Sequence, residues 1–143
     1  MQLNSILTIR ITLQYMAWSE NQIEYVWNRA TIVKGYDENR FRKDACGAWI
    51  IRDKYGDNDS LYGWEIDHIV PKVLLEEKGF GQEDIDRSEN LRALQHDNNA
   101  SKSDDYPSYT AVVTSEGTEN VKMTKFLEVN DRKQEVLRNL YNL

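Results

Sequence analysis

The chain has 143 residues, of which 40% are hydrophobic and 29% charged, a composition typical of one soluble globular domain. Its 18 basic and 24 acidic side chains give a net charge of −6, which argues against a protein whose whole surface binds nucleic acid. One cysteine and two histidines exclude an internal disulfide and a cysteine-rich zinc site, so any metal site must rely on oxygen ligands.

The first segment, residues 3–16, is rich in Ile, Leu and Thr, which predicts a β-strand. Arg10 interrupts the apolar run and no small-residue cleavage site follows, so the segment does not resemble a targeting signal. There is no run of about 18 uncharged apolar residues, which predicts that no part spans a membrane. With a free cysteine and no signal, we expect a protein of the reducing cytoplasm.

The next pattern along the chain is helical. Residues 20–33 carry apolar side chains at helical spacing, and Ser19 or Asn21 suits the N-terminal cap, so a helix is predicted there. Residues 37–55 mix charged side chains with a short apolar run, Ala48–Ile51, which fits either a helix or the edge of a strand.

The middle of the chain contains an apolar segment followed by an acidic one. Residues 62–70 predict a strand that ends near Pro71, and residues 72–89 predict a long acidic connection with one helical turn at Val73–Glu77. Residues 91–102 predict a short helix, which a proline shortly afterwards prevents from continuing.

The C-terminal part has the clearest local signals. Residues 109–115 and 121–129 alternate as strands around Glu116-Gly117, which predicts a hairpin. Residues 131–142 have apolar side chains at helical spacing, and Asn130 is a good N-cap, so the chain is predicted to end in a helix.

Positive charge is concentrated in one segment. Residues 29–54 contain seven basic and four acidic side chains, a local charge of +3 in an acidic protein. Arg40, Arg42 and Lys43 are therefore candidate phosphate contacts, and the alternative is that they form an ordinary solvated face. The acidic run in 76–89 is interpreted as a solvated loop.

One group of residues combines the functions that phosphodiester chemistry needs. Asp67 and the amide of Asn99 offer oxygen ligands for Mg²⁺ or a similar ion. His68 is suited to remove a proton from water, and Asn90 to hold the imidazole in one orientation. Lys102, three residues after Asn99, shares its helical face and is suited to bind a phosphate oxygen.

This arrangement carries one geometric condition. Adjacent residues on a regular strand point to opposite sides. Asp67 and His68 therefore serve one site only if the strand bends or ends there, as the nearby Pro71 suggests.

Three runs, WEIDHIVPK (64–72), ENLRAL (89–94) and HDNNASKSD (96–104), resemble the motif of the HNH endonuclease family. The upstream run FRKDACGAWI (41–50) also resembles small bacterial proteins with this motif. The resemblance implies a ββα-metal (His-Me) finger at about 62–104, in which a hairpin carries Asp-His, a loop carries Asn and a helix carries the third residue.

In this H-N-N version the resemblance implies that His68 is the general base and that Asn90 orients it. It also implies that Asp67 and Asn99 hold a divalent metal ion, Mg²⁺ in the first instance, with Mn²⁺ or Ni²⁺ as alternatives. The cysteine pairs that bind zinc in many HNH proteins are absent from this sequence, so no structural zinc is expected.

The resulting prediction is a small α+β domain over 1–143, with the HNH motif at about 62–104 and a hairpin plus C-terminal helix over 105–143. The predicted function is metal-dependent endonuclease cleavage of nucleic acid, with double-stranded DNA as the expected substrate. Two alternatives remain open: an inactive HNH-fold nucleic-acid-binding module, which the charge of −6 favours, and a toxin nuclease with an immunity partner.

Other conspicuous residues have simpler interpretations. His96 shares a helical face with the third motif residue, and a surface or supporting role is favoured over a ligand role. Trp27, Trp49 and Trp64 are expected in the core rather than stacked on bases. Cys46 is expected to be an inert buried thiol.

Overall fold

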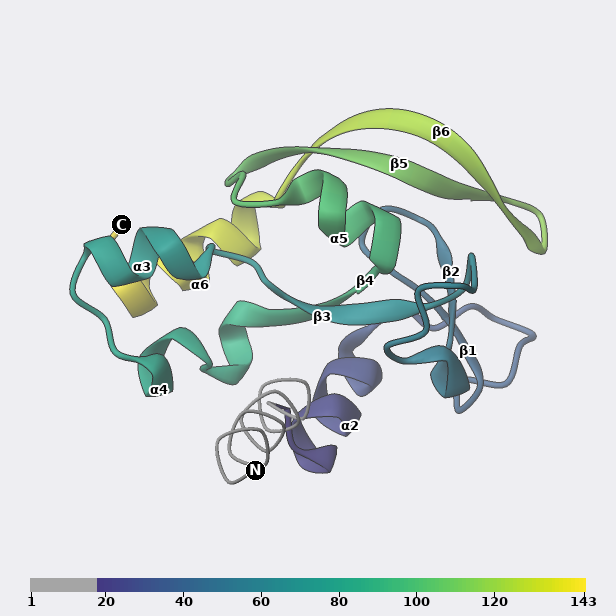
Figure 1. Ribbon diagram of the computed structural model, residues 1–143, viewed down its shortest axis with the longest axis horizontal. Coiled ribbons are helices and arrows are strands. Elements are labelled where there is room, and N and C mark those ends of the chain that lie inside the picture. Colours follow the sequence, from purple (N-terminus) through teal and green to yellow (C-terminus); the bar gives the residue numbers. More distant parts are fainter. Residues whose placement is uncertain (1–17) are drawn as a thin grey trace, which may run out of the picture.

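The computed structural model describes residues 18–143, so the strand predicted for 3–16 lies outside the described part. Within that part, three two-stranded antiparallel sheets combine with short helices (Figure 1), which confirms the α+β class of a small single domain. None of the helices in residues 18–143 has the length and apolar character needed to cross a bilayer.

Helix α2 (Glu20–Arg29) begins where it was predicted. Ser19 caps it in a capping box with Gln22, in which each side chain binds the other residue's backbone N–H. The helix is shorter than predicted because Thr31 leaves it to form an antiparallel bridge with Lys43, with both N–H···O distances at 2.9 Å.

The apolar run 48–51, whose conformation the sequence left open, is extended. Strands β1 (Phe41–Lys43) and β2 (Trp49–Ile51) form a short hairpin. A 3-10 turn, Arg52–Lys54, follows it. The hairpin turn passes through Gly47 at φ +84°, a backbone conformation that glycine adopts without strain.

Strand β3 (Trp64–His68) pairs antiparallel with β4 (Leu91–Gln95), which leads directly into helix α5 (His96–Lys102). The prediction of a helix over 91–102 is therefore wrong in its first half. Alternate side chains of β4 pack against α2, and this packing favours the strand over local helix propensity. Gln95 then caps α5 by accepting hydrogen bonds from two backbone N–H groups.

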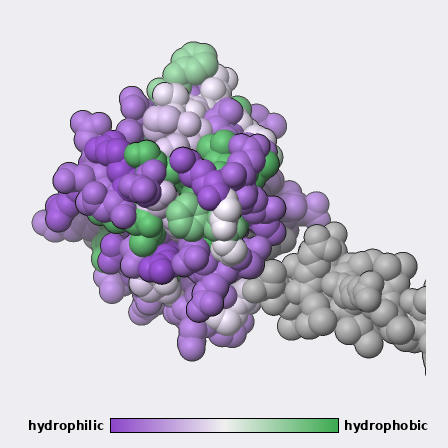
Figure 2. Space-filling model, turned by 90° about the vertical axis from the view of Figure 1, so that its left-hand side faces the viewer, coloured by the Kyte–Doolittle hydropathy of each residue, from purple (hydrophilic) through white to green (hydrophobic). Residues whose placement is uncertain are grey.

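The connection between β3 and β4 is more helical than predicted. It contains α3 (Lys72–Glu77), which confirms the helical turn at 73–77, followed by α4 (Gln82–Ile85) and a 3-10 turn, Ser88–Asn90. Figure 2 looks onto this end of the molecule and shows mostly hydrophilic side chains around small hydrophobic patches. The acidic segment thus lies at the surface, as predicted, but in helical turns rather than a loop.

The C-terminal prediction is confirmed. Strands β5 (Ser108–Glu116) and β6 (Glu119–Glu128) form the long hairpin, and α6 (Asp131–Tyr141) follows. Asn130 caps α6, because its Oδ1 accepts a hydrogen bond from the backbone N–H of Lys133 at 2.8 Å.

Two apolar clusters hold these elements together. One joins α2 to β3 and β4, and its buried members are Ile23, Val26, Trp27, Ile50, Trp64, Ile66, Leu91 and Ala93. The other joins the β3–β4 connection to β5 and α6 and includes Cys46. The three tryptophans predicted for the core are buried. Burial raises the pKa of the Cys46 thiol to about 12, consistent with an inert thiol.

Candidate active site

Strands β3 and β4, which α3 and α4 separate along the chain, pack with α5 into a strand–strand–helix unit (Figure 1). Asp67 and His68 come from the end of β3, Asn90 immediately precedes β4, and Asn99 and Lys102 come from α5. The unit brings the predicted residues into one region because β3 and β4 pair in register, with His68 opposite Leu91.

His68 is partly accessible, with 20% of its side chain exposed. Its Nε2 lies 2.7 Å from Oδ1 of Asp86, and its ring lies against Trp18 with centroids 5.3 Å apart. Gln82 donates a second hydrogen bond to the same oxygen of Asp86. Among residues 18–143, Nδ1 of His68 has no hydrogen-bond partner, and it carries the lone pair when Nε2–H donates to Asp86.

Asn90 is fully buried and contacts the backbone around His68 rather than its ring. Its Oδ1 accepts a hydrogen bond from the N–H of Val70 at 2.8 Å, and its Nδ2 donates to the carbonyls of Val70 and Ile85. The asparagine therefore fixes the chain just after β3. The imidazole is oriented by Asp86, a residue that the sequence analysis did not select.

Asp67 faces α5 and is 5% exposed. Its Oδ2 accepts a hydrogen bond from Nε of Arg92 at 3.0 Å, and its Oδ1 lies 3.3 Å from Nζ of Lys102. Lys102 is fully buried and also donates to the carbonyl of His68 at 3.1 Å. Burial lowers the pKa of the Lys102 ammonium, and Asp67 opposes that shift.

A shared site was predicted only if the strand bends or ends at Asp67-His68. Strand β3 ends at His68 but does not bend there. Pairing with β4 runs regularly through His68, so Asp67 and His68 point to opposite faces of the strand. Trp64 and Ile66 lie on the α2 face with His68, as their packing against α2 shows. Lys102 is held beneath Asp67 and in this conformation does not reach a phosphate at the surface.

Asn99 contacts Glu65 rather than Asp67, the residue with which it was predicted to share a metal ion. Its Nδ2 donates to Oε2 of Glu65 at 2.8 Å, and both side chains are partly exposed. Glu65 lies two residues before Asp67 on the same face of β3. That spacing was visible in the sequence and could have indicated Glu65 as a further oxygen ligand.

The donor set fits a hydrated divalent ion better at Glu65 and Asn99 than at Asp67. In the part of the chain that the structure describes, no three His, Cys, Asp or Glu side chains are arranged to hold a metal. The Glu65 carboxylate and the Asn99 amide are hard oxygen donors of the kind that bind Mg²⁺ together with several waters. Asp67 would join them only by leaving its two cations.

The predicted nucleic-acid contacts have different environments. Arg40 is exposed, and Lys43 lies over the ring of Trp49 at 4.8 Å. Arg42 is buried, and its guanidinium donates to three backbone carbonyls, two of them at the end of α2. Arg42 thus fastens α2 to β1, and its burial argues against contact with a phosphate.

His96 and Asn98 hold the site unit in place. Nε2 of His96 lies 2.8 Å from the carbonyl of Ser60, which agrees with a supporting role. Asn98 contacts the backbone of β5 and donates to the buried carboxylate of Asp44, which also accepts from the N–H of Gln95. Burial raises the pKa of Asp44, and these hydrogen bonds oppose the shift.

No family model, curated protein or solved structure gives a significant match to this chain. The chemistry of the site is therefore inferred from three groups of its own residues: the His68–Asp86 pair, the Glu65–Asn99 pair and the buried Asp67 cluster.

Proposed function

We propose that this protein is an HNH-type, metal-dependent endonuclease that hydrolyses phosphodiester bonds of nucleic acid, with double-stranded DNA as its substrate. The observation that carries the proposal is the His68–Asp86 contact of 2.7 Å in a strand–strand–helix unit that also contains the rest of the motif. A partly exposed imidazole held by a carboxylate is an oriented general base.

In this proposal, Nδ1 of His68 takes a proton from the attacking water while Asp86 keeps Nε2 in place. The water oxygen forms a bond to phosphorus, the bond to the 3′ oxygen breaks, and the 3′ oxygen takes a proton from bulk water while His68 releases its proton to solvent. Asn90 supports this geometry because it fixes the backbone at Val70. Glu65 and Asn99, on the α5 face of β3 opposite His68, would hold a divalent ion that supplies positive charge to the bound nucleic acid strand.

A specific observation favours the second candidate, an inactive nucleic-acid-binding module of the same fold. Asp67 is buried between Arg92 and Lys102 on the face of β3 opposite His68. A carboxylate held in this way neutralises two cations inside the fold and contributes little to a metal site. Cleavage and binding must therefore be measured separately.

The test is conversion of supercoiled plasmid to nicked circles in the presence of Mg²⁺, Mn²⁺ or Ni²⁺, with EDTA as the metal-free arm. We compare the wild type with His68→Ala and with His96→Gln, which removes the other imidazole of the unit but keeps an amide donor for the Ser60 carbonyl. Nicking by the wild type and His96→Gln, but not by His68→Ala or with EDTA, supports the endonuclease. DNA binding without cleavage under any of the three ions supports the binding module instead.

A further inference from the structure

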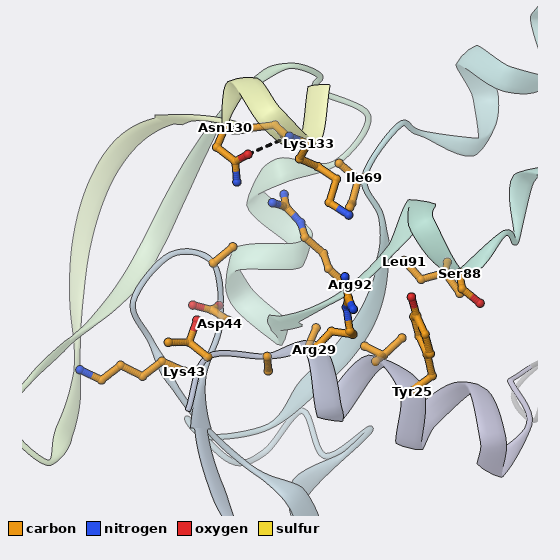
Figure 3. Close-up of a pocket in the computed structure, with 16 residues that line it drawn as sticks. Tyr25, Arg29, Lys43, Asp44, Ile69, Ser88, Leu91, Arg92, Asn130 and Lys133 are labelled. Atoms are coloured by element: carbon orange, nitrogen blue, oxygen red, sulfur yellow. Dashed lines mark hydrogen bonds between the residues drawn. The ribbon is translucent and has the colours of Figure 1, made fainter. Parts of the chain in front are cut away.

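A basic pocket lies on the other side of β4 from β3. It has a volume of about 210 Å³ and opens between α2, the first half of β4 and the first turn of α6 (Figure 3). Four of its lining residues are basic: Arg29, Lys43, Arg92 and Lys133. This concentration of positive charge occurs in a protein whose net charge is −6.

Three of these cations lie together, and the lining of the pocket contains a single carboxylate. Figure 3 shows the side chains of Arg29, Arg92 and Lys133 near one another, whereas Lys43 points away, over the ring of Trp49. The one carboxylate in the lining, Asp44, already accepts hydrogen bonds from three backbone N–H groups and from Asn98.

The cationic groups themselves are incompletely paired. Arg92 uses Nε to bind Asp67, but its Nη2 is buried without a hydrogen-bond partner among residues 18–143. Nζ of Lys133 has a long contact of 3.4 Å with the carbonyl of Glu89. Burial lowers the pKa of Lys133, the nearby positive charges of Arg29 and Arg92 lower it further, and Glu89 opposes the shift. An anion would relieve this repulsion.

We propose that this pocket binds a phosphate group of a nucleic acid strand, an inference that builds on the proposed endonuclease function. Two arginines and a lysine match the charge of a phosphate, and arginine adds paired donors for its oxygens. Neutral donors also line the pocket, from Ser88 and from Asn130, whose Oδ1 is occupied as the cap of α6.

The size and position of the pocket agree with this ligand. Sites for whole small molecules have volumes of about 300–1,000 Å³, so a pocket of about 210 Å³ suits a phosphate group rather than an entire nucleotide. Leu91, which lines the pocket, is the cross-strand partner of His68. A phosphate in the pocket would therefore hold the substrate one strand away from the general base.

The test measures binding of a short fluorescent DNA duplex by anisotropy in EDTA, where metal-dependent cleavage is blocked. The double variant Arg29→Gln/Lys133→Gln is compared with Lys34→Gln/Arg132→Gln. The control loses the same two charges, and its Arg132 is exposed and adjacent to Lys133 on α6. Arg92 is left unchanged because its loss would unbalance Asp67.

We expect the pocket variant to bind at least about tenfold more weakly than the wild type, since charged hydrogen bonds each contribute about that much. The control should lose less than about threefold, because Lys34 and Arg132 do not line the pocket and act only through the screened field. The slope of log affinity against log salt should fall by about one for the pocket variant. Inorganic phosphate, at constant ionic strength, should compete with the duplex on the wild type.

Equal losses in the two double variants would show a general charge effect and overturn the inference, as would a failure of inorganic phosphate to compete. A 5′-phosphorylated duplex that binds more tightly than its 5′-hydroxyl form identifies a terminal phosphate as the ligand, and equal binding identifies an internal one. If the wild type nicks plasmid but the pocket variant loses no more DNA affinity than the control, the pocket is refuted and the endonuclease is not. If the pocket variant alone loses DNA affinity but the wild type does not nick under any ion, the endonuclease is refuted and the pocket is not.

Discussion

The two faces of β3 hold neighbouring charged side chains in different ways. On the α5 face, Asp67 is buried and bound by both Arg92 and Lys102. On the α2 face, His68 is partly exposed, and among residues 18–143 its one polar side-chain partner is Asp86. Two adjacent residues of one motif therefore differ: the carboxylate is paired with two cations, whereas the imidazole keeps one ring nitrogen unpaired within residues 18–143.

The largest effect is expected on the nicking rate when the imidazole of His68 is removed. His68→Ala should lower the rate of metal-dependent nicking by about 10²–10⁴-fold, because the proposed general base is lost. DNA binding in EDTA should stay within about threefold of the wild type, since the imidazole is not a phosphate ligand in this scheme. A His68→Ala protein that nicks at the wild-type rate would place the base elsewhere.

Removing the buried carboxylate of Asp67 should primarily affect the free energy of unfolding. Asp67→Ala leaves Arg92 and Lys102 buried without their counter-charge and should cost about 3–5 kcal/mol in the free energy of unfolding. Glu65→Gln, on the same face of β3 but partly exposed, should cost less than about 1 kcal/mol. Urea denaturation of both variants measures the difference.

Metal binding by the same two variants shows whether Glu65 or Asp67 is the carboxylate ligand. Calorimetric titration with Mn²⁺ should show weaker binding for Glu65→Gln than for the wild type, since a carboxylate ligand is replaced by a neutral amide. If Asp67→Ala stays folded and loses Mn²⁺ binding while Glu65→Gln retains it, Asp67 is the ligand and its contacts with Arg92 and Lys102 are broken in the active enzyme.

A smaller effect is expected from the residue that orients His68. Asp86→Asn should reduce the nicking rate by about 10- to 100-fold, the usual range for a residue that positions another. The loss should appear in kcat rather than in KM, because Asp86 is not proposed to contact DNA. Gln82→Ala, which removes the other side-chain contact of Asp86, is the matched control and should stay within about threefold.

The smallest effect concerns Cys46, which is buried close to the Asp67 cluster. Its Sγ lies 4.0 Å from the hydroxyl of Tyr109, and Arg92 packs over the ring of that tyrosine. With a thiol pKa of about 12, Cys46 should resist a thiol reagent at pH 8 in the folded protein and react after unfolding in urea. Rapid labelling without denaturant would show that the α5 face opens.

Local signals predicted the elements whose determinants lie close together in the chain. Ser19 and Gln22 form the capping box that begins α2, and Asn130 begins α6. Glu116-Gly117 correctly marked the β5–β6 turn. In each case the decisive hydrogen bonds join residues a few positions apart, so the printed sequence contains both partners of the interaction.

The errors occurred where distant residues decide the structure. The run 91–95 carries an ambiguous local pattern, and its pairing with β3 and packing on α2 make it a strand. Asp86 was overlooked because it is 18 residues from His68. Arg42 was predicted at a basic surface, but the end of α2 folds back over it and supplies carbonyl partners.

By itself, the sequence determined which chemical groups are available: two histidines, one cysteine, an oxygen-rich ligand set and a −6 charge with a local basic segment. It also determined the capped helices and the C-terminal hairpin. Which charged side chains form ion pairs, and which line a pocket, depends on the tertiary fold. Burial brings Asp67 between two cations, leaves His68 with Asp86, and gathers Arg29, Arg92 and Lys133 around one pocket. The physical reason is that desolvation and ion pairing depend on contacts between residues far apart in the chain.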